Sequence, residues 1–454
     1  MSDDRHRFVV VGAGPAGNAA ATTAATLGAR VVMIEDAIVG GAAHLRDCLP
    51  SKAMVASSMR LFALRTADRL GVAAPDGAGP DLPRLEARLE RLSADVSAGT
   101  QELLRSQGVE IHHGRGRLTA DRTAVADVAG ITEMFPFDSA LVSTGSSPRV
   151  PAWARVDGER VLTTRDAYGL DALPEHLVII GSGVTGVEFV HIFSSLGSKV
   201  TLLVSRQQVL PHRDPEVAAL LEEIFLEREV GLLIGARASA AYAAGGGVVV
   251  EIEDGRRVEG SHVLLAVGSV PNTAGLGLEE AGVATDGGGF VVVDEFLRTT
   301  ASGIYAAGDV TGQMPLSSVA AMQGRKVAAH ALGRPVKPLD YGKMAQAIFT
   351  EPEIASVGLE EADAVGEGRK VRITKVPFAA NARALIQGTP RGFVKVVSDP
   401  ATHEVLGGTV VGHHASELIA TLAVAVQARL KVDVLAETLM VYPSLSESLM
   451  DAAD

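Results

Sequence analysis

The chain has 454 residues, of which 47% are apolar and 21% charged, enough to build two or three globular domains. Its formal net charge is −13 and no basic run occurs, which argues against nucleic acid as a partner. The apolar stretch at residues 418–428 is too short to cross a bilayer, so we expect no integral membrane segment. The first ten residues hold acids and no long apolar region, and the chain has one cysteine, so we expect no secretory signal and a cytoplasmic protein.

Two segments share one plan, in which an apolar strand leads through a glycine-rich turn into a helix. They read RFVVVGAGPAGNAAATTAATLGARVVMIE, from residue 7, and HLVIIGSGVTGVEFVHIFSSLGSKVTLLVSR, from residue 176. In such a turn the first glycine permits the bend, the second lets the backbone approach a pyrophosphate, and the third lets helix and strand pack closely. The two sets are Gly12, Gly14 and Gly17, with Pro15 and Ala16 at the helix start, and Gly181, Gly183 and Gly186. The sequence therefore predicts a duplicated dinucleotide-binding unit, with phosphates at each helix N-terminus.

Two acidic residues are candidates for holding the rest of a dinucleotide. Glu35 ends the second strand of the first unit, where a carboxylate can accept hydrogen bonds from both ribose hydroxyls. Its other interpretation is a solvated acid at a strand end. Asp309 follows a strand and a glycine turn in GIYAAGDVTG, where an isolated aspartate is usually a turn former.

This last segment resembles the second FAD motif of the flavoprotein disulfide reductases, the family of dihydrolipoamide dehydrogenase, glutathione reductase and soluble transhydrogenase. The resemblance covers nearly the whole chain, including IFTEPEIASVG at residues 348–358. It implies an α/β fold with two Rossmann-like domains, a C-terminal α+β dimerisation domain, bound FAD and a homodimer. The expected FAD-binding domain comprises residues 1–149 and 273–342, the NAD(P)H-binding domain residues 150–272, and the dimerisation domain residues 343–454.

The resemblance also implies site residues. Further cofactor-binding positions are Gly116, Thr144, Gly145, Gly268, Leu316 and Ser317. The helix that starts at Leu316 should stabilise negative charge on reduced flavin with its positive end. In the family, Lys52 of the PSK motif pairs with the glutamate after the second glycine set, here Glu188, beside flavin N5. We therefore expect the hydride transfer from nicotinamide to survive.

Three departures from the family pattern shape the expected reaction. In GGAAHLRDCLPSK, Ala43 stands where the first of two redox thiols belongs, leaving Cys48 alone. In YPSLSE, Tyr442 replaces the acid–base histidine that the partner subunit supplies, while Glu447 is intact. A phenol with a pKa near 10 cannot replace an imidazole at neutral pH. Val184 replaces an aromatic residue at the nicotinamide niche. The sequence predicts no disulfide reductase activity, because one thiol cannot complete the exchange.

The remaining Cys48 has two interpretations. It could form a sulfenate with peroxide, as in single-cysteine relatives, or it could be a small packing residue on the flavin's face. We favour packing, because those relatives carry their thiol in another motif. His413 and His414 lie away from the YP motif and are interpreted as polar residues at a strand end. The other histidines lack metal-binding spacing, so we expect no metal site.

The hydride donor is predicted from the end of the second unit. The position that would hold a carboxylate for NADH is Val204, followed by Ser205 and Arg206. A carboxylate would repel a 2′-phosphate, whereas serine plus arginine can bind it. We therefore expect NADPH as donor, with NADH also accepted. Alternatively, Arg206 simply faces solvent.

The hypothesis that fits these residues best is that the protein is an FAD enzyme that passes electrons from NAD(P)H to a quinone. Removal of the thiol at Ala43 leaves room for a flat acceptor, and Tyr442 of the partner could hydrogen-bond it. Three alternatives remain. They are a soluble pyridine nucleotide transhydrogenase, a single-cysteine NAD(P)H peroxidase or oxidase, and a non-enzymatic FAD-binding protein, against which the Lys52–Glu188 pair argues.

Overall fold

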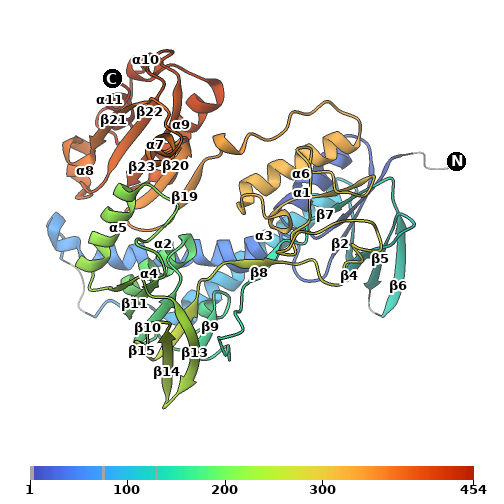
Figure 1. The fold of residues 1–454 in the computed structure, drawn as a ribbon, viewed down its shortest axis with the longest axis horizontal. Coiled ribbons are helices and arrows are strands. Elements are labelled where there is room, and N and C mark those ends of the chain that lie inside the picture. Colours follow the sequence, from blue (N-terminus) through green and yellow to red (C-terminus); the bar gives the residue numbers. More distant parts are fainter. Residues whose placement is uncertain (1–4, 74–76, 129) are drawn as a thin grey trace. The chain divides into compact units, whose positions relative to one another are not determined.

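The structure is a computed structural model that describes residues 5–73, 77–128 and 130–454 (Figure 1). The expectation of no secretory signal rests partly on residues 1–4, which lie outside the described residues. The chain divides into two compact units. Unit 1 comprises Met1–Pro50, Ala87–Arg149 and Gly268–Leu339, and unit 2 comprises Ser51–Glu86, Val150–Val267 and Asp340–Asp454.

Unit 1 is built on a parallel sheet of five strands, in the order β18-β7-β1-β2-β3. The strands are β1 (Arg7–Val11), β2 (Arg30–Glu35), β3 (Glu110–His113), β7 (Ser139–Val142) and β18 (Ile304–Ala306). The last four residues of β1 are buried, as expected for a central parallel strand covered on both faces. Helices α1 (Pro15–Thr26) and α6 (Ser317–Ala331) pack closely together. A Cβ at Gly324 of α6 would lie 2.0 Å from the Ala16 carbonyl oxygen, so this approach requires glycine.

Several further elements belong wholly or partly to unit 1. A π-helix, η1 (Ala43–Cys48), runs directly into α2 (Leu49–Arg65). The division between the units crosses α2 and also α3 (Leu82–Ser106). An antiparallel sheet of three strands consists of β4 (Arg115–Leu118), β5 (Thr123–Val128) and β6 (Ile131–Pro136). A two-stranded sheet pairs β8 (Ser146–Pro148) with β17 (Ser269–Pro271), and η4 (Asp309–Thr311) follows β18.

Unit 2 contains a second parallel sheet, in the order β12-β11-β10-β16-β9. Its strands are β9 (Val161–Thr163), β10 (His176–Ile180), β11 (Lys199–Val204), β12 (Gly231–Ile234) and β16 (His262–Leu265). Unit 2 also contains the helices α4 (Val184–Leu196) and α5 (Pro215–Glu227) and the short helices η2 (Ala67–Leu70) and η3 (Asp166–Tyr168). A three-stranded antiparallel sheet again accompanies it, formed by β13 (Ala238–Ala244), β14 (Gly247–Ile252) and β15 (Arg257–Gly260). The duplication predicted from the two glycine motifs is confirmed.

The C-terminal part of unit 2 is an antiparallel sheet of five strands in the order β19-β20-β23-β22-β21. These strands are β19 (Gln346–Ile348), β20 (Glu353–Gly358), β21 (Arg372–Pro377), β22 (Phe393–Ser398) and β23 (Val405–Gly412). Leu418 and Leu422 of α9 (Ala415–Ala428) pack in a core with valines of the sheet, such as Val394 and Val410. The shorter helices are η5 (Tyr341–Lys343), α7 (Glu361–Gly366), η6 (Phe378–Ala380), α8 (Ala382–Gln387), α10 (Val432–Ala436) and α11 (Glu447–Asp451). The predicted α/β class with a C-terminal α+β domain is confirmed.

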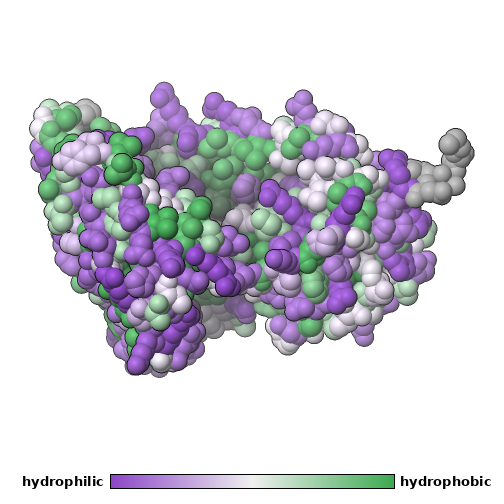
Figure 2. Space-filling model, turned by 90° about the horizontal axis from the view of Figure 1, so that it is seen from above, coloured by the Kyte–Doolittle hydropathy of each residue, from purple (hydrophilic) through white to green (hydrophobic). Residues whose placement is uncertain are grey.

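The chain re-enters unit 1 at Gly268 and leaves it after Leu339. These points lie near the expected domain boundaries at residues 273 and 342, which stay predictions. Among the described residues, no helix is both long enough and apolar enough to span a membrane. On the face drawn in Figure 2, polar residues predominate and apolar residues form separate patches.

Candidate functional site

Four of the six motif glycines are required by the fold itself. Gly12 and Gly181 have φ angles of 101° and 111°, a region that favours glycine. A Cβ at Gly12 would lie 2.5 Å from the Ser143 carbonyl oxygen, and one at Gly181 would lie 2.2 Å from the Ala266 carbonyl oxygen. The third glycine of each set meets the first, because added Cβ atoms at Gly17 and Gly186 would lie 2.1 and 1.8 Å from those glycines' carbonyl oxygens.

The two middle glycines differ, because the fold does not require them. Gly14 and Gly183 have ordinary φ angles of −73° and −74°. A Cβ at Gly14 would meet nothing closer than 3.8 Å, and one at Gly183 would meet nothing within 4 Å. Both residues are the N-caps of long helices, and neither helix has a side-chain cap there. Open space beside unpaired N–H groups suits a pyrophosphate, so the residues present fit two dinucleotides.

Glu35 lies at the end of β2 and is almost fully buried. Its carboxylate accepts hydrogen bonds from the N–H groups of Ala13 (2.7 Å), Ala37 (2.8 Å) and Ile38 (3.2 Å). Burial raises the pKa of Glu35, and these hydrogen bonds oppose that rise. An ionised carboxylate offers about four acceptor sites, so three backbone donors leave room for a ribose hydroxyl. Glu35 is thus not a solvated strand-end acid.

Asp309 begins η4 in unit 1 and accepts a hydrogen bond from Ser146 Oγ at 2.9 Å. Burial raises its pKa, which the bond from Ser146 opposes. The preceding Gly308 has a φ of 80°. Asp309 is therefore partly buried and hydrogen-bonded to β8, unlike a turn residue that faces only solvent.

The other cofactor positions also lie in unit 1. Thr144 donates its hydroxyl to the Asn272 carbonyl at 2.7 Å, and Gly145 has a φ of 71°. Gly268 has a φ of 90° and open space around it, whereas a Cβ at Gly116 would lie 3.0 Å from Val11, so packing alone accounts for that glycine. Leu316 is the N-cap of α6 and Ser317 its first residue. Their cofactor contacts stay predictions.

Lys52 and Glu188 form an ion pair in unit 2, with Lys52 Nζ 2.7 Å from Glu188 Oε2. The other oxygen, Oε1, accepts the N–H of Phe349 at 3.0 Å, and the Phe349 ring centroid lies 5.1 Å from Lys52 Nζ. The Glu188 side chain is 5% exposed and that of Lys52 is 30% exposed. The carboxylate is therefore buried with its partners, while the ammonium retains an open side. The structure brings together the two residues that the family resemblance paired.

Cys48 and Ala43 are the two ends of η1, and Cys48 is half-buried. This degree of burial is compatible with both interpretations of the thiol, packing and sulfenate formation. Tyr442 is 75% exposed, and Glu447, in α11, accepts the N–H of Ser444 at 3.0 Å. Val184, at the start of α4, is 41% exposed.

His413 follows β23, and its Nδ1 lies 3.7 Å from Glu351 Oε2. That carboxylate raises the pKa of His413. His414 is the N-cap of α9, and its ring centroid lies 3.9 Å from that of His413. Both lie at the end of a strand, as the sequence indicated.

The register of the two sheets fixes which residue corresponds to Glu35. Val11 pairs with Ile34 in unit 1, and Ile180 pairs with Leu203 in unit 2, so Val204 occupies the position of Glu35. Val204 is fully buried. Ser205 and Arg206 follow it and are exposed. Arg206 has no ion-pair partner among the described residues.

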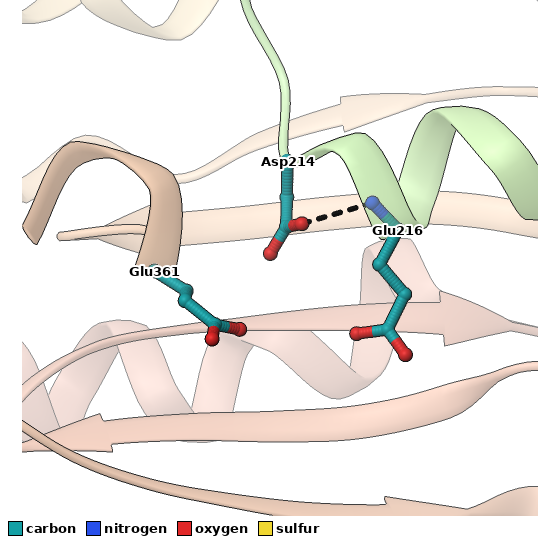
Figure 3. A group of neighbouring side chains, drawn as sticks. All are labelled: Asp214, Glu216 and Glu361. Atoms are coloured by element: carbon teal, nitrogen blue, oxygen red, sulfur yellow. Dashed lines mark hydrogen bonds between the residues drawn. The ribbon is translucent and has the colours of Figure 1, made fainter. Parts of the chain in front are cut away.

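An acidic cluster that the sequence analysis missed lies in unit 2. The carboxylates of Asp214, Glu216 and Glu361 point toward one another, with oxygens within 4.8 Å (Figure 3). Lys395 Nζ lies among them, 2.8, 2.8 and 2.6 Å from the three carboxylates. Burial acts to lower the pKa of Lys395, but these hydrogen bonds outweigh it and raise the pKa. A buried ammonium therefore already occupies the centre of the cluster and offsets part of its negative charge, and Lys375 pairs with Glu216 from outside. No local motif signals it, because its members lie up to 181 residues apart.

Comparison with known proteins agrees with this fold, in which two units of the dinucleotide-binding type precede an antiparallel C-terminal sheet. Residues 6–324 match the model of the family described as pyridine nucleotide-disulphide oxidoreductase, and residues 344–453 match its dimerisation domain. The chain therefore belongs to the pyridine nucleotide-disulphide oxidoreductase family. The family is one of flavoenzymes that use FAD and NAD(P)H, and this chain is an oxidoreductase of that kind.

Several relatives cover almost the full chain. A protein of Mycobacterium tuberculosis named NAD(P)H dehydrogenase (quinone) is 46% identical over 458 residues, 98% of this chain and 93% of its own. Dihydrolipoyl dehydrogenase of Chlamydia muridarum is 34% identical over 447 residues, 98% of this chain and 95% of its own. The crystal structure of LpdA from Mycobacterium tuberculosis is similar, with a TM-score of 0.94, 46% identity and 99% of each chain covered. The flavoprotein disulfide reductase RclA from Escherichia coli gives a TM-score of 0.88 at 27% identity, again with 99% of each chain covered.

Proposed function

We propose that this protein passes electrons from NADPH, and also NADH, through FAD to a quinone-type acceptor, without reducing disulfides. The observation that carries the proposal is that the Lys52–Glu188 ion pair is present while the residues for disulfide exchange are missing. Ala43 has no thiol, and Tyr442 has no imidazole. A relative of 46% identity is named NAD(P)H dehydrogenase (quinone), which supports the acceptor class.

Different residues would bind the cofactor and assist the hydride transfer. Bound FAD would supply the ability to accept hydride from nicotinamide and pass two electrons on. Glu35 and the N-terminus of α1 would hold the adenosine and pyrophosphate, and Asp309 the region between pyrophosphate and flavin. Glu188 holds Lys52 in one orientation, so the ammonium presents a fixed positive charge where negative charge gathers during reduction. Neither residue needs a thiol for this role.

The preference for NADPH is supported by the position that matches Glu35. In unit 1 that carboxylate accepts the N–H groups of Ala13, Ala37 and Ile38. By register, the matching donors in unit 2 are the N–H groups of Ser182, Arg206 and Gln207. Within the described part of the chain, these three groups have no hydrogen-bond acceptor. Unsatisfied donors beside an exposed arginine suit a 2′-phosphate.

A second arginine nearby is already engaged, which leaves this role to Arg206. Arg213 donates to Ser356 Oγ at 2.9 Å and forms an ion pair with Glu360. Its side chain is 14% exposed. Arg213 therefore holds the segment after β11 against the C-terminal sheet and is unsuited to phosphate.

Replacing Val204 with glutamate and Arg206 with alanine should shift the preference toward NADH. The new carboxylate can use the backbone donors that correspond in unit 2 to those of Glu35, and it repels a 2′-phosphate whose counter-charge is gone. A charge-assisted contact of about 1.5–3 kcal/mol corresponds to a fall of about tenfold or more in kcat/KM for NADPH, mainly through KM. The matched control is Arg257→Ala, which removes an exposed arginine on β15. It should leave kcat/KM for NADPH and for NADH unchanged. A wild type that prefers NADH, or an unchanged double variant, would show that Arg206 only faces solvent.

A homodimer is also proposed. The segment before α11 exposes Leu439 (95%), Val441 (76%) and Tyr442 (75%) within the family's dimerisation domain. Exposed apolar residues in one short segment are typical of an interface. In the dimer, Tyr442 of each subunit could donate a hydrogen bond to the acceptor at the other's flavin. A cytoplasmic location stays a prediction.

The proposed function is tested by an anaerobic acceptor panel. The FAD-loaded protein is reduced with one equivalent of NADPH and mixed with menadione, an oxidised nicotinamide analogue or peroxide. We expect rapid reoxidation by menadione, and we expect Cys48→Ser to leave that rate within about threefold of wild type, since the acceptor needs no thiol. Faster turnover of the nicotinamide analogue would favour a transhydrogenase instead. Peroxide turnover that vanishes in Cys48→Ser would favour a single-cysteine peroxidase.

A further inference from the structure

Three elements of unit 2 supply the Lys52–Glu188 site. Helix α2 carries Lys52, helix α4 carries Glu188, and the segment after β19 provides the N–H of Phe349. A second group of contacts joins the same three elements, and it is centred on Arg228, the residue after α5.

Arg228 bridges all three elements with one half-buried side chain. Its Nη1 lies 3.1 Å from His191 Nδ1 on α4, and its Nη2 donates to the Glu351 carbonyl at 2.7 Å. The guanidinium carbon lies 4.5 Å from the centre of the Phe62 ring on α2. Burial lowers the pKa of Arg228, which Glu351 opposes, but guanidinium remains charged at any physiological pH. A planar donor with several N–H groups can hold such partners at once.

His191 is the link between Arg228 and the helix that carries Glu188. It lies three residues beyond Glu188 on α4 and is fully buried. Guanidinium only donates hydrogen bonds, so Nδ1 must accept, and the proton of the neutral ring lies on Nε2. That nitrogen faces Ser58 Oγ of α2 at 3.5 Å, and Ser58 donates in turn to the Val55 carbonyl at 2.9 Å. Burial and the charge of Arg228 lower the pKa of His191 to about 3, which agrees with a neutral ring.

The far end of the two helices is fixed as well. Arg65 of α2 donates to the Ser195 carbonyl of α4 at 2.6 Å. Polar contacts therefore join α2 to α4 at Lys52, Ser58 and Arg65, and only the first is the expected site.

We propose that His191 and Arg228 are positioning residues that hold α2, α4 and the Phe349 segment in the register that the Lys52–Glu188 pair requires. This inference rests on the function proposed above for that pair. Neither residue touches the reacting atoms; both act by preventing the two helices from shifting. A displacement of about 1 Å at a reacting centre can cost on the order of 100-fold in rate, so such bracing matters for hydride transfer.

The first test compares two replacements of His191 in the FAD-loaded protein. Phenylalanine fills the space and removes both polar contacts, whereas glutamine keeps one acceptor and one donor. We expect His191→Phe to slow flavin reduction by NADPH about tenfold or more, with FAD content retained, and His191→Gln to stay within about threefold. Ser195→Ala is the matched control on the same helix, because its hydroxyl has no hydrogen-bond partner in the described structure. It should match wild type, and an equal loss in Ser195→Ala would overturn the proposal.

A double-mutant cycle separates positioning from general support of the fold. If His191 acts through Glu188, His191→Phe should add nothing to the loss already caused by Glu188→Gln. Losses that multiply in the double variant would overturn the proposal. Loss in Glu188→Gln without loss in His191→Phe overturns the brace alone, whereas no loss in either overturns the role of the pair and the brace together. If His191→Phe does not fold, Arg228→Lys serves instead. Its single ammonium cannot contact His191, the Glu351 carbonyl and the Phe62 ring at once, so it should also slow flavin reduction.

A measurement on the wild type needs no turnover, and the conservative His191→Gln variant serves only to assign one signal. With ¹⁵N-labelled histidine, the His191 signal, assigned by its loss in His191→Gln, should report a neutral ring protonated on Nε2. That signal should not change between about pH 5 and pH 8, because the pKa of His191 lies near 3. A ring that titrates in this range, or one protonated on Nδ1, would overturn the assigned contact with Arg228.

Discussion

Replacing Lys52 with methionine should slow reduction of the bound flavin by NADPH about 100-fold, because removing one preorganised donor that faces developing negative charge typically costs about 10²–10³ in rate. Methionine is apolar and of similar length, but it removes the ammonium that pairs with the buried Glu188 carboxylate and lies over the Phe349 ring. Glu188→Gln keeps the bond from Phe349 and also leaves Lys52 without its counter-charge, so a similar loss is expected. Stopped-flow absorbance at the flavin band measures the rate.

FAD content decides how this loss is interpreted. The ratio of flavin to protein absorbance should be unchanged in both variants, because Glu35, Asp309 and the glycine turn, and not this pair, are the expected anchors of the dinucleotide. Lys343→Met is the matched control, since its exposed partner Asp340 lies 3.9 Å away and such surface pairs contribute little. Parallel loss of FAD and of rate would mean that the pair is structural.

Wild-type protein should not turn over lipoamide or glutathione disulfide, even when NADPH and menadione are turned over rapidly. The exchange needs an attacking thiolate and a resolving thiol, and this chain has a single cysteine. Tyr442 also lacks an imidazole's ability to exchange protons near neutral pH. An NADPH-consumption assay with each disulfide measures this directly, and robust turnover with either would contradict the proposed function.

Restoring the second thiol sharpens this test. Ala43 and Cys48 are the ends of the π-helix η1, in which the Leu49 N–H bonds to the His44 carbonyl five residues earlier. A five-residue turn brings its ends close, so Ala43→Cys should form a disulfide with Cys48, and thiol titration of the unfolded, unreduced protein should find no thiol. Ala42→Cys, one residue earlier, should retain two. Two titratable thiols in Ala43→Cys would show that the segment does not support the family's dithiol.

The sequence alone determined the features that depend on residue type or on residues close together in the chain. The glycines of each motif predicted both nucleotide-binding units, because a positive φ at Gly12 and the close packing of Gly17 are needs of one turn. The missing thiol at Ala43 and the missing imidazole at Tyr442 are visible from residue type alone. The Lys52–Glu188 pair was found only through resemblance to a family, since its members lie 136 residues apart.

Tertiary structure alone decided what depends on distant residues. Register showed that Val204 corresponds to Glu35, and packing showed that Arg213 is bound while Arg206 is exposed. No sequence motif indicated that His191 contacts Arg228 and Ser58 or that Lys395 lies among three carboxylates. The protonation of a buried group is set by the charges and donors around it, and folding brings these together from remote positions. For that reason the sequence could predict the type of reaction and its main residues. Only the tertiary structure revealed the distant residues, such as His191 and Arg228, that contact the elements carrying them.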